Sequence, residues 1–410
     1  MSVSTQLQAT TYRLERWRAL ASGIIDTGPQ TFLLLIAVAY FQAGNTAQSL
    51  VATGGAIGMV LSPLTIFYAR RLGLPVARAA SFLLALGAFF VFIPVFWFQL
   101  WIYVAGTMLA MISISAAIPL FTQLYQDNYK KSSRGRLFSR STMIKVAAGG
   151  IFSYIAGDIL NRDIGFARLV LVALAFCFLI GSWLLYICPS AKLQPEQGSF
   201  PFRSLRSVLE DNAFAWVLLS WMFMGFGNLM MFPIRVKFLL EPRFGIEYPV
   251  AWVAIITGVI PAVVHFATSP FWGILFDRIN FFVMRVILNL IFVAAVSSFF
   301  LGRSLPMFVL GSVFFGLAFG GGNVAWGLWV TKMTTGDKVA DYMSCHTFFT
   351  GVRSFLAPVL SIWLVSFIPM PSVVGISVLL ILIASLMLLP ELQSVRRRRA
   401  GTPLIEDVSE

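Results

Sequence analysis

Charged residues are scarce in this chain of 410 residues. Asp, Glu, Lys and Arg make up only 11% of it, and 58% of the residues are hydrophobic. Soluble domains carry about 25% charged residues, and a soluble fold of this length could not bury so much apolar surface. The composition therefore excludes an ordinary soluble domain and favours a chain whose outer surface is solvated by lipid.

Cysteine is also rare, and its spacing indicates no chemistry. Cys177, Cys188 and Cys345 lie in or beside apolar runs, where small packing residues are more common than metal ligands or disulfides. A phosphate loop is missing too, because the run Gly320–Gly322 is not followed by Lys and Ser or Thr. We therefore predict no catalytic residue, no metal site and no cofactor, so any pumping must use a gradient or a partner.

Long apolar runs are what the sequence has in abundance. A membrane-spanning helix needs about 20 apolar residues, and backbone groups cannot stay unpaired in lipid, so each run must be helical. The first run lacks a small-residue cleavage site and is expected to be a retained span. Twelve spans are predicted, at 19–41, 47–69, 75–97, 100–124, 138–160, 166–188, 213–234, 249–275, 281–302, 305–330, 341–368 and 371–390.

The net charge of +13 is distributed as membrane topology requires. With a cytoplasmic N-terminus, 22 of the 30 Lys and Arg fall in inside segments and six in outside segments. An even number of spans then places both termini in the cytoplasm, and nucleic acid is not expected as a partner. The six outside residues are Arg162, Arg168, Arg235, Lys237, Arg243 and Arg303.

A polar stretch divides the chain into two halves. It is rich in Pro, Gly, Ser, Gln and charged residues, as a linker is. The expected fold class is an all-α integral membrane protein, with twelve transmembrane helices in two pseudo-symmetric six-helix bundles. The predicted domains are an N-terminal bundle at 1–188, a cytoplasmic linker at 189–212, a C-terminal bundle at 213–390 and a cytoplasmic tail at 391–410.

The two halves share a short repeat at an offset of 207 residues. Five residues match in a window of 17 without gaps, at the end of the second span of each half and in the loop that follows. The matches are Ser62 with Ser269, Pro63 with Pro270, Arg71 with Arg278, Val76 with Val283, and Arg78 with Arg285. Because the offset is half the chain, we infer an internal duplication, which is a feature of many transporters.

The repeated segment resembles the G-x-x-x-D-R-x-G signature of the major facilitator superfamily. The second copy keeps Gly273, Asp277 and Arg278 and has Asn280 in place of the last Gly. Asn also tolerates a left-handed turn. The resemblance implies a secondary transporter that alternates between inward-open and outward-open states, with helices 1, 4, 7 and 10 lining a central cavity.

The first copy departs from the signature at one position. It keeps Arg71 and Gly73 but has Arg70 where the family has Asp. An Asp at the cytoplasmic end of a helix can pair with Arg and with a facing helix N-terminus, so the resemblance implies a conformational latch. Its candidate residues are Gly273, Asp277, Arg278, Arg71 and Gly73; a solvated topology anchor is the alternative.

Ionisable residues inside spans are costly and are candidates for function. Asp26 lies in the first span, one helical turn from Gln30. Desolvation there would favour a proton carrier, and a nearby cation would favour a static ion pair. Arg353 lies mid-span, where its guanidinium could bind a carboxylate or phosphate, or pair with Asp26 or backbone carbonyls.

Four further spans contribute candidates. Lys145 lies closer to the cytoplasmic side, where its stem can snorkel, and His265 is a proton relay or a hydrogen-bonded core residue. Asn228, Asn323 and Trp326 complete the candidate substrate and coupling-ion set. Because Lys145 and Arg353 outnumber the one clear intramembrane acid, an anionic or zwitterionic organic solute is expected.

The predicted function is therefore secondary active transport of a small organic solute, with protons as a candidate coupling ion. Its expected setting is the plasma (inner) membrane, as a multi-pass monomer that contacts the lipid bilayer. The family's Gly-Pro pattern of drug antiporters and Pro-Glu-Ser pattern of sugar porters are both missing. The alternatives are a membrane-embedded enzyme acting on lipid-linked substrates and a non-transporting sensor on the same fold.

Overall fold

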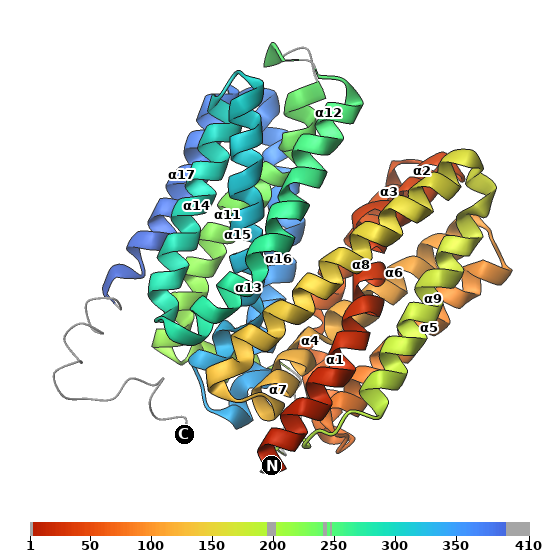
Figure 1. Cartoon of the computed structure of the whole chain (residues 1–410), viewed down its shortest axis with the longest axis vertical. Helices are drawn as coiled ribbons and strands as arrows, with labels where there is room; N and C mark the ends of the chain where they lie inside the picture. The colour runs from red at the N-terminus through yellow and green to blue at the C-terminus, as the bar shows by residue number, and fades with distance from the viewer. Residues whose placement is uncertain (1–2, 195–201, 241–243, 247, 391–410) are drawn as a thin grey trace. The chain divides into compact units, whose positions relative to one another are not determined.

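The computed structural model describes residues 3–194, 202–240, 244–246 and 248–390. Within these residues the regular secondary structure is helical, apart from one isolated bridge between Pro75 and Lys192. Figure 1 shows the helices in chain order. The first half contains α1 (Val3–Thr27), the π-turn η1 (Gly28–Phe32), α2 (Leu33–Ala39), α3 (Asn45–Val60), α4 (Ser62–Arg71), α5 (Val76–Phe96), α6 (Leu100–Ala116), α7 (Ile118–Asn128), α8 (Arg134–Arg162) and α9 (Ala167–Tyr186).

The second half repeats the pattern with fewer breaks. It contains α10 (Arg203–Leu209), α11 (Asn212–Leu240), α12 (Val250–Ala254), the π-turn η5 (Ile255–Val259), α13 (Ile260–Arg278), α14 (Phe281–Leu301), α15 (Leu305–Leu328), α16 (Val339–Phe367) and α17 (Met370–Leu386). Short 3₁₀ turns lie at Lys131–Ser133, Ile164–Phe166, Trp329–Lys332 and Gly336–Lys338. The predicted tail at 391–410 lies outside the described residues.

Nine helical segments of the described chain are long and apolar enough to cross a membrane, or ten if the bent pair α3 and α4 is one span. Two further runs are consistent with the predicted count of twelve. The α1–η1–α2 run overlaps the first predicted span, and α17 is an apolar helix of 17 residues at the last. The predicted fold class is therefore confirmed, although α1 begins at Val3 and α11 ends at Leu240, outside the predicted spans 19–41 and 213–234.

Proline explains why several spans are broken into two helices. Pro63 lies in the first turn of α4, where α3 and α4 meet at 50°, and Pro119 lies in the first turn of α7. Proline has no backbone N–H and suits a first helical turn better than a helix interior. Pro270, the repeat partner of Pro63, instead lies inside the continuous helix α13. The duplicated proline therefore has different local effects in the two halves.

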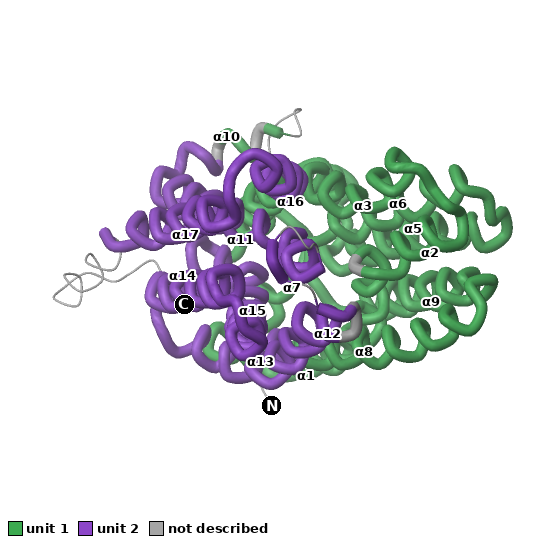
Figure 2. Tube along the Cα trace, turned by 90° about the horizontal axis from the view of Figure 1, so that it is seen from above, with its two compact units in different colours: residues 1–137, 141–206, 336–351 green, residues 138–140, 207–335, 352–410 purple. Residues whose placement is uncertain are grey.

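The described chain forms two compact units (Figure 2). Unit 1 contains Met1–Leu137, Ser141–Arg206 and Gly336–Gly351, and unit 2 contains Phe138–Arg140, Ser207–Thr335 and Val352–Glu410. Helix α16 therefore belongs to unit 1 up to Gly351 and to unit 2 from Val352. The domain boundaries predicted from the sequence stay a prediction.

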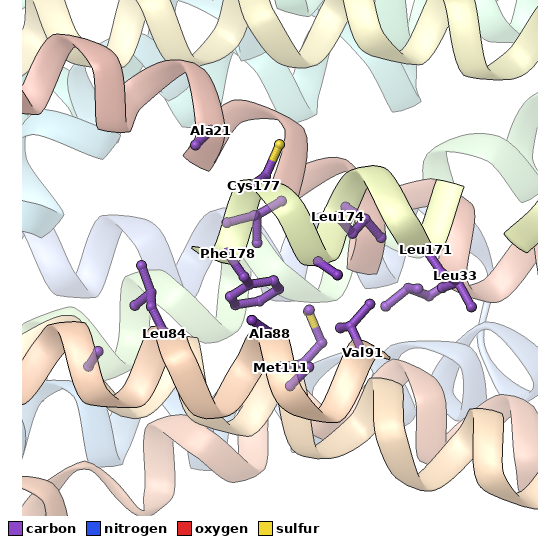
Figure 3. Packing of buried hydrophobic residues seen from close by; sticks show 14 of the residues in the cluster. Ala21, Leu33, Leu84, Ala88, Val91, Met111, Leu171, Leu174, Cys177 and Phe178 are labelled. Atoms are coloured by element: carbon purple, nitrogen blue, oxygen red, sulfur yellow. The ribbon is translucent and has the colours of Figure 1, made fainter. Parts of the chain in front are cut away.

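The core of unit 1 is built on the packing of α5 against α9 (Figure 3). Phe178 of α9 is buried beside Ala88 and Leu84 of α5. Ser81 and Ser182 each donate to the other's carbonyl oxygen, at 2.7 and 2.9 Å. These reciprocal bonds satisfy two buried hydroxyls without water, as a bilayer-embedded bundle requires.

The core of unit 2 is aromatic at one end. Trp329 stacks on Phe214 with ring centroids 5.0 Å apart and on Phe281 at 5.9 Å, and Trp221 lies 5.9 Å away. All four side chains are buried. Rings of this size bury large apolar areas and hold α11, α14 and the turn that follows α15 together.

Candidate functional site

Asp26 and Lys145 form an ion pair between α1 and α8 of unit 1. Their Oδ2 and Nζ atoms are 2.5 Å apart, and their side chains are 37% and 38% exposed. The helices approach closely beside the pair. A Cβ on Gly149 would lie only 2.9 Å from the carbonyl oxygen of Gly23. The structure therefore brings together two predicted site residues, with both charges half-exposed.

The helix changes its winding directly after Asp26. Residues Gly28–Phe32, including Gln30, form the π-turn η1, with Pro29 in its first turn. Isolated π-turns often occur at functional sites, and here the extra residue per turn rotates α2 relative to α1. That Asp26 and Gln30 act together stays a prediction.

His265 and Asn323 also lie together, in unit 2. The Asn323 Nδ2 and His265 Nε2 atoms are 3.1 Å apart, and they join α13 to α15. Trp326 lies about one turn beyond Asn323 and is half-buried. Asn228 lies on α11 with a buried Oδ1 that accepts no hydrogen bond from the described residues.

Arg353 lies in the interior of unit 2 and is 4% exposed. Its Nη1 donates to the carbonyl oxygen of Trp221, and its guanidinium lies against the backbone of Gly225. Arg285 covers the other side of this region, with its Cζ 3.4 Å from the Trp221 ring centroid. The sequence leaves two roles open for Arg353: binding substrate, or pairing with Asp26 or backbone carbonyls. The hydrogen bond to the Trp221 carbonyl oxygen is of the second kind. Contact of Arg353 with substrate stays a prediction.

The structure adds a buried acid that the sequence prediction misses. Because α1 begins at Val3, Glu15 and Arg18 lie inside the bundle rather than before it. Arg18 donates from Nε and Nη2 to the Glu15 carboxylate at 2.7 and 2.5 Å, and the Tyr125 hydroxyl donates to the same carboxylate at 2.7 Å. Glu15 precedes the predicted span 19–41, and the i,i+3 spacing of Glu15 and Arg18 was the available signal for this buried pair.

The first copy of the repeated motif forms an ion pair in which the motif supplies the cation and another helix supplies the acid. Arg70, at the position where the family has Asp, donates from Nη1 and Nη2 to the Asp341 carboxylate of α16 at 2.7 and 2.5 Å. Arg71 is exposed, and Gly73 has φ +60°, a left-handed conformation that favours glycine. The acid that pairs with this loop therefore comes from α16.

The second copy is organised differently. Asn280 has φ −59° and accepts a 2.8 Å hydrogen bond from the Phe282 N–H, so it caps α14 and makes no left-handed turn. Gly273 is buried, Asp277 is half-buried and Arg278 is exposed. A latch role for these residues stays a prediction.

Comparison with known proteins identifies the class of fold. A sequence profile described as Major Facilitator Superfamily matches residues 251–407. No curated protein sequence matches the chain significantly. The profile match lies in the second half of the chain and agrees with the family that the motifs predict.

Solved structures share the fold over nearly the whole chain. The fucose:proton symporter of E. coli has a TM-score of 0.72 at 13% identity, covering 94% of this chain and 98% of its own. A bacterial homologue of the iron transporter ferroportin has 0.71 at 15%, covering 95% and 99%. The human organic anion transporter has 0.68 at 14%, covering 95% and 100%.

Proposed function

We propose that this protein is a secondary active transporter of a small organic solute, anionic or zwitterionic, that works by alternating access. The observation that carries the proposal is the half-exposed Asp26–Lys145 pair inside the span-1 and span-5 helices. Charges within a span are costly, and where they occur they commonly mark a substrate or proton pathway. Partial exposure leaves both groups reachable by a solute or a proton, which a closed structural pair would not be.

Proton coupling follows from the chemistry of this pair. When Asp26 is charged, it neutralises Lys145; when a proton or a solute carboxylate displaces one partner, the other is freed. Exchange of partners gives the two loaded states that a coupled carrier needs. The proposed setting is the plasma (inner) membrane with both termini cytoplasmic, and the proposed partners are the solute, lipid and protons, with the chain acting as a monomer and not as an enzyme.

The first experiment identifies a solute. Purified full-length protein is screened by thermal stabilisation against organic acids, zwitterions and organic cations. A solute at about 100 times its Kd adds about 2.7 kcal/mol of stability. Solutes that stabilise the protein are then tested for flux in proteoliposomes. The transport proposal would be refuted if no class of solute stabilised the protein, or if none of the stabilising solutes were transported.

The second experiment tests the Asp26–Lys145 pair. We expect Asp26→Asn to reduce accumulation driven by a pH gradient at least about tenfold, because the carboxyl can no longer exchange its proton. Exchange of solute across the membrane at equal pH should persist. The matched control is Asp158→Asn on α8, whose pair with Arg162 is 50% and 75% exposed at 2.7 Å; equal losses in both variants would contradict the role of Asp26.

A further inference from the structure

Arg235 is buried in unit 2 without a carboxylate partner among the described residues. The sequence places it just outside the predicted span, whereas α11 continues to Leu240 and leaves it 8% exposed. Its Nε and Nη1 atoms have no hydrogen-bond partner in the described part of the chain. A buried guanidinium with free N–H groups is costly, so the site is incomplete as it stands.

Three phenylalanine rings surround this guanidinium. Its Cζ lies 4.8 Å from the ring centroid of Phe232, 4.7 Å from Phe315 and 5.8 Å from Phe319. The ring faces attract the cation, but they accept none of its in-plane hydrogen bonds. Phe315 is buried, whereas Phe232 and Phe319 are half-buried and stack on each other at 5.1 Å. The aromatic cover is therefore partly open on the side of these two rings.

The same two helices carry polar groups at the other end of the ring stack. Asn228, Phe232 and Arg235 have the i, i+4, i+7 spacing of one face of α11. Phe315, Phe319 and Asn323 follow one face of α15 in the opposite direction. The contacts of Phe232 with Phe319 and of Arg235 with Phe315 set the register. The facing surfaces of α11 and α15 therefore carry a cation at one end, apolar rings in the middle and the two Asn amides at the other end.

We propose that Arg235 is an anion subsite that binds the carboxylate of an organic acid, with the apolar body of the acid over Phe232 and Phe319. The subsite deepens the proposed transport function and rests on it. A carboxylate carries one charge, which one guanidinium compensates; a phosphate ester would retain uncompensated charge in an apolar setting. The amides of Asn228 and Asn323 are then placed for a polar group at the far end of the solute.

The test uses the purified full-length protein and probes of matched shape. The probes are 4-phenylbutyrate, its neutral amide 4-phenylbutanamide, 4-phenylbutylamine and phenyl phosphate, with binding measured by calorimetry in detergent. We expect the carboxylate to bind at least about tenfold tighter than the amide, because charge-assisted hydrogen bonds are stronger than neutral ones. Arg235→Gln should remove that preference, and Arg303→Gln, at an exposed position before α15, should keep it.

Several outcomes would overturn the subsite. They are equal affinity for carboxylate and amide, tighter binding of the amine or phosphate, no binding of any probe, or an unchanged preference in Arg235→Gln. If that variant does not fold, Phe319→Leu provides the second test, because it keeps the cation and removes one ring. It should weaken 4-phenylbutyrate at least about threefold, and an unchanged affinity would refute the aromatic contact.

Calorimetry needs no membrane gradient, so the two proposals fail separately. Binding through Arg235 without flux of any solute would refute transport and leave the anion subsite. Flux of organic solutes that is unaffected by Arg235→Gln, together with an unchanged probe preference, would refute the subsite and leave transport.

Discussion

At the scale of single residues, identical amino acids at matching positions of the duplicated motif have different environments. Arg78 and Arg285 are repeat partners, yet Arg78 is exposed beside Tyr186 and Arg285 is 1% exposed against Trp221. A basic residue near a span end can therefore be a topology signal in one half and part of the core in the other. Both guanidinium groups lie over an aromatic ring, but Trp221 is buried and Tyr186 is exposed.

The Arg353 contact gives a prediction at this scale. A Cβ on Gly225 would overlap the Arg353 guanidinium, whose side chain is buried. We expect Gly225→Ala to lower the free energy of unfolding by about 1–3 kcal/mol, as overpacking does. Thermal unfolding in detergent measures the change, with Gly375→Ala on α17 as control, because a Cβ there meets nothing within 4 Å.

A double-mutant cycle separates packing from helix propensity. If the overlap is the cause, Gly225→Ala should cost little once Arg353→Ala has removed the guanidinium. Additive losses in the double variant would show that Arg353 does not limit the space at Gly225.

At the scale of elements, glycine decides which helices approach closely. Gly149 and Gly150 are neighbours on α8, but only a Cβ on Gly149 would press on the backbone of α1, at the Gly23 carbonyl oxygen. Small residues permit such close approaches between transmembrane helices. The Asp26–Lys145 pair lies beside this crossing, so the packing of α1 on α8 positions the charges.

The two glycines make a matched pair of variants. Gly149→Ala should push α1 away from α8, lower thermal stability by about 1–3 kcal/mol and reduce flux. Gly150→Ala should be neutral or slightly stabilising, because alanine favours the helix and a Cβ there meets nothing within 4 Å. Melting curves and flux of both proteins decide; equal behaviour would mean that the crossing does not control the ion pair.

At the scale of the whole molecule, helix α16 is divided between the two units. Its first part and the preceding turn belong to unit 1 and bond to side chains of α4 and α7. Arg70 pairs with Asp341, the Ser62 hydroxyl donates to the Ser344 carbonyl oxygen at 3.1 Å, and Gln123 bonds to Gly336 and Ala340 at 2.7 and 2.8 Å. From Val352 onward the same helix belongs to unit 2, and all of these contacts lie within unit 1.

Charge exchange tests the contact of Arg70 with Asp341. The Arg70 and Asp341 side chains are 8% and 14% exposed, so Arg70→Asp should lower stability by about 3–5 kcal/mol, because it leaves two buried acids facing each other. The double variant Arg70→Asp with Asp341→Arg should recover at least half of the loss and of the flux. Failure of the exchanged pair to recover either quantity would exclude an electrostatic role for this contact.

The sequence alone determined the class of this protein. Apolar runs of about 20 residues must form helices in lipid, so composition and length predicted twelve spans. The repeat from Ser62 to Arg78 and its copy in the second half predicted the superfamily. These features are local or periodic along the chain, and no knowledge of packing is needed to recognise them.

Only the tertiary structure decided which charges meet. The pairing of Asp26 with Lys145, the pairing of Arg70 with Asp341 and the placement of Arg235 against Phe315 and Phe319 depend on side chains far apart in the chain. The sequence also did not predict where α1 begins and α11 ends, because the polar first half of α1 and the charged end of α11 carry little hydropathy signal. A bundle can bury such residues when neighbouring helices supply carboxylates, hydroxyls or aromatic rings, and those neighbours are set by the fold.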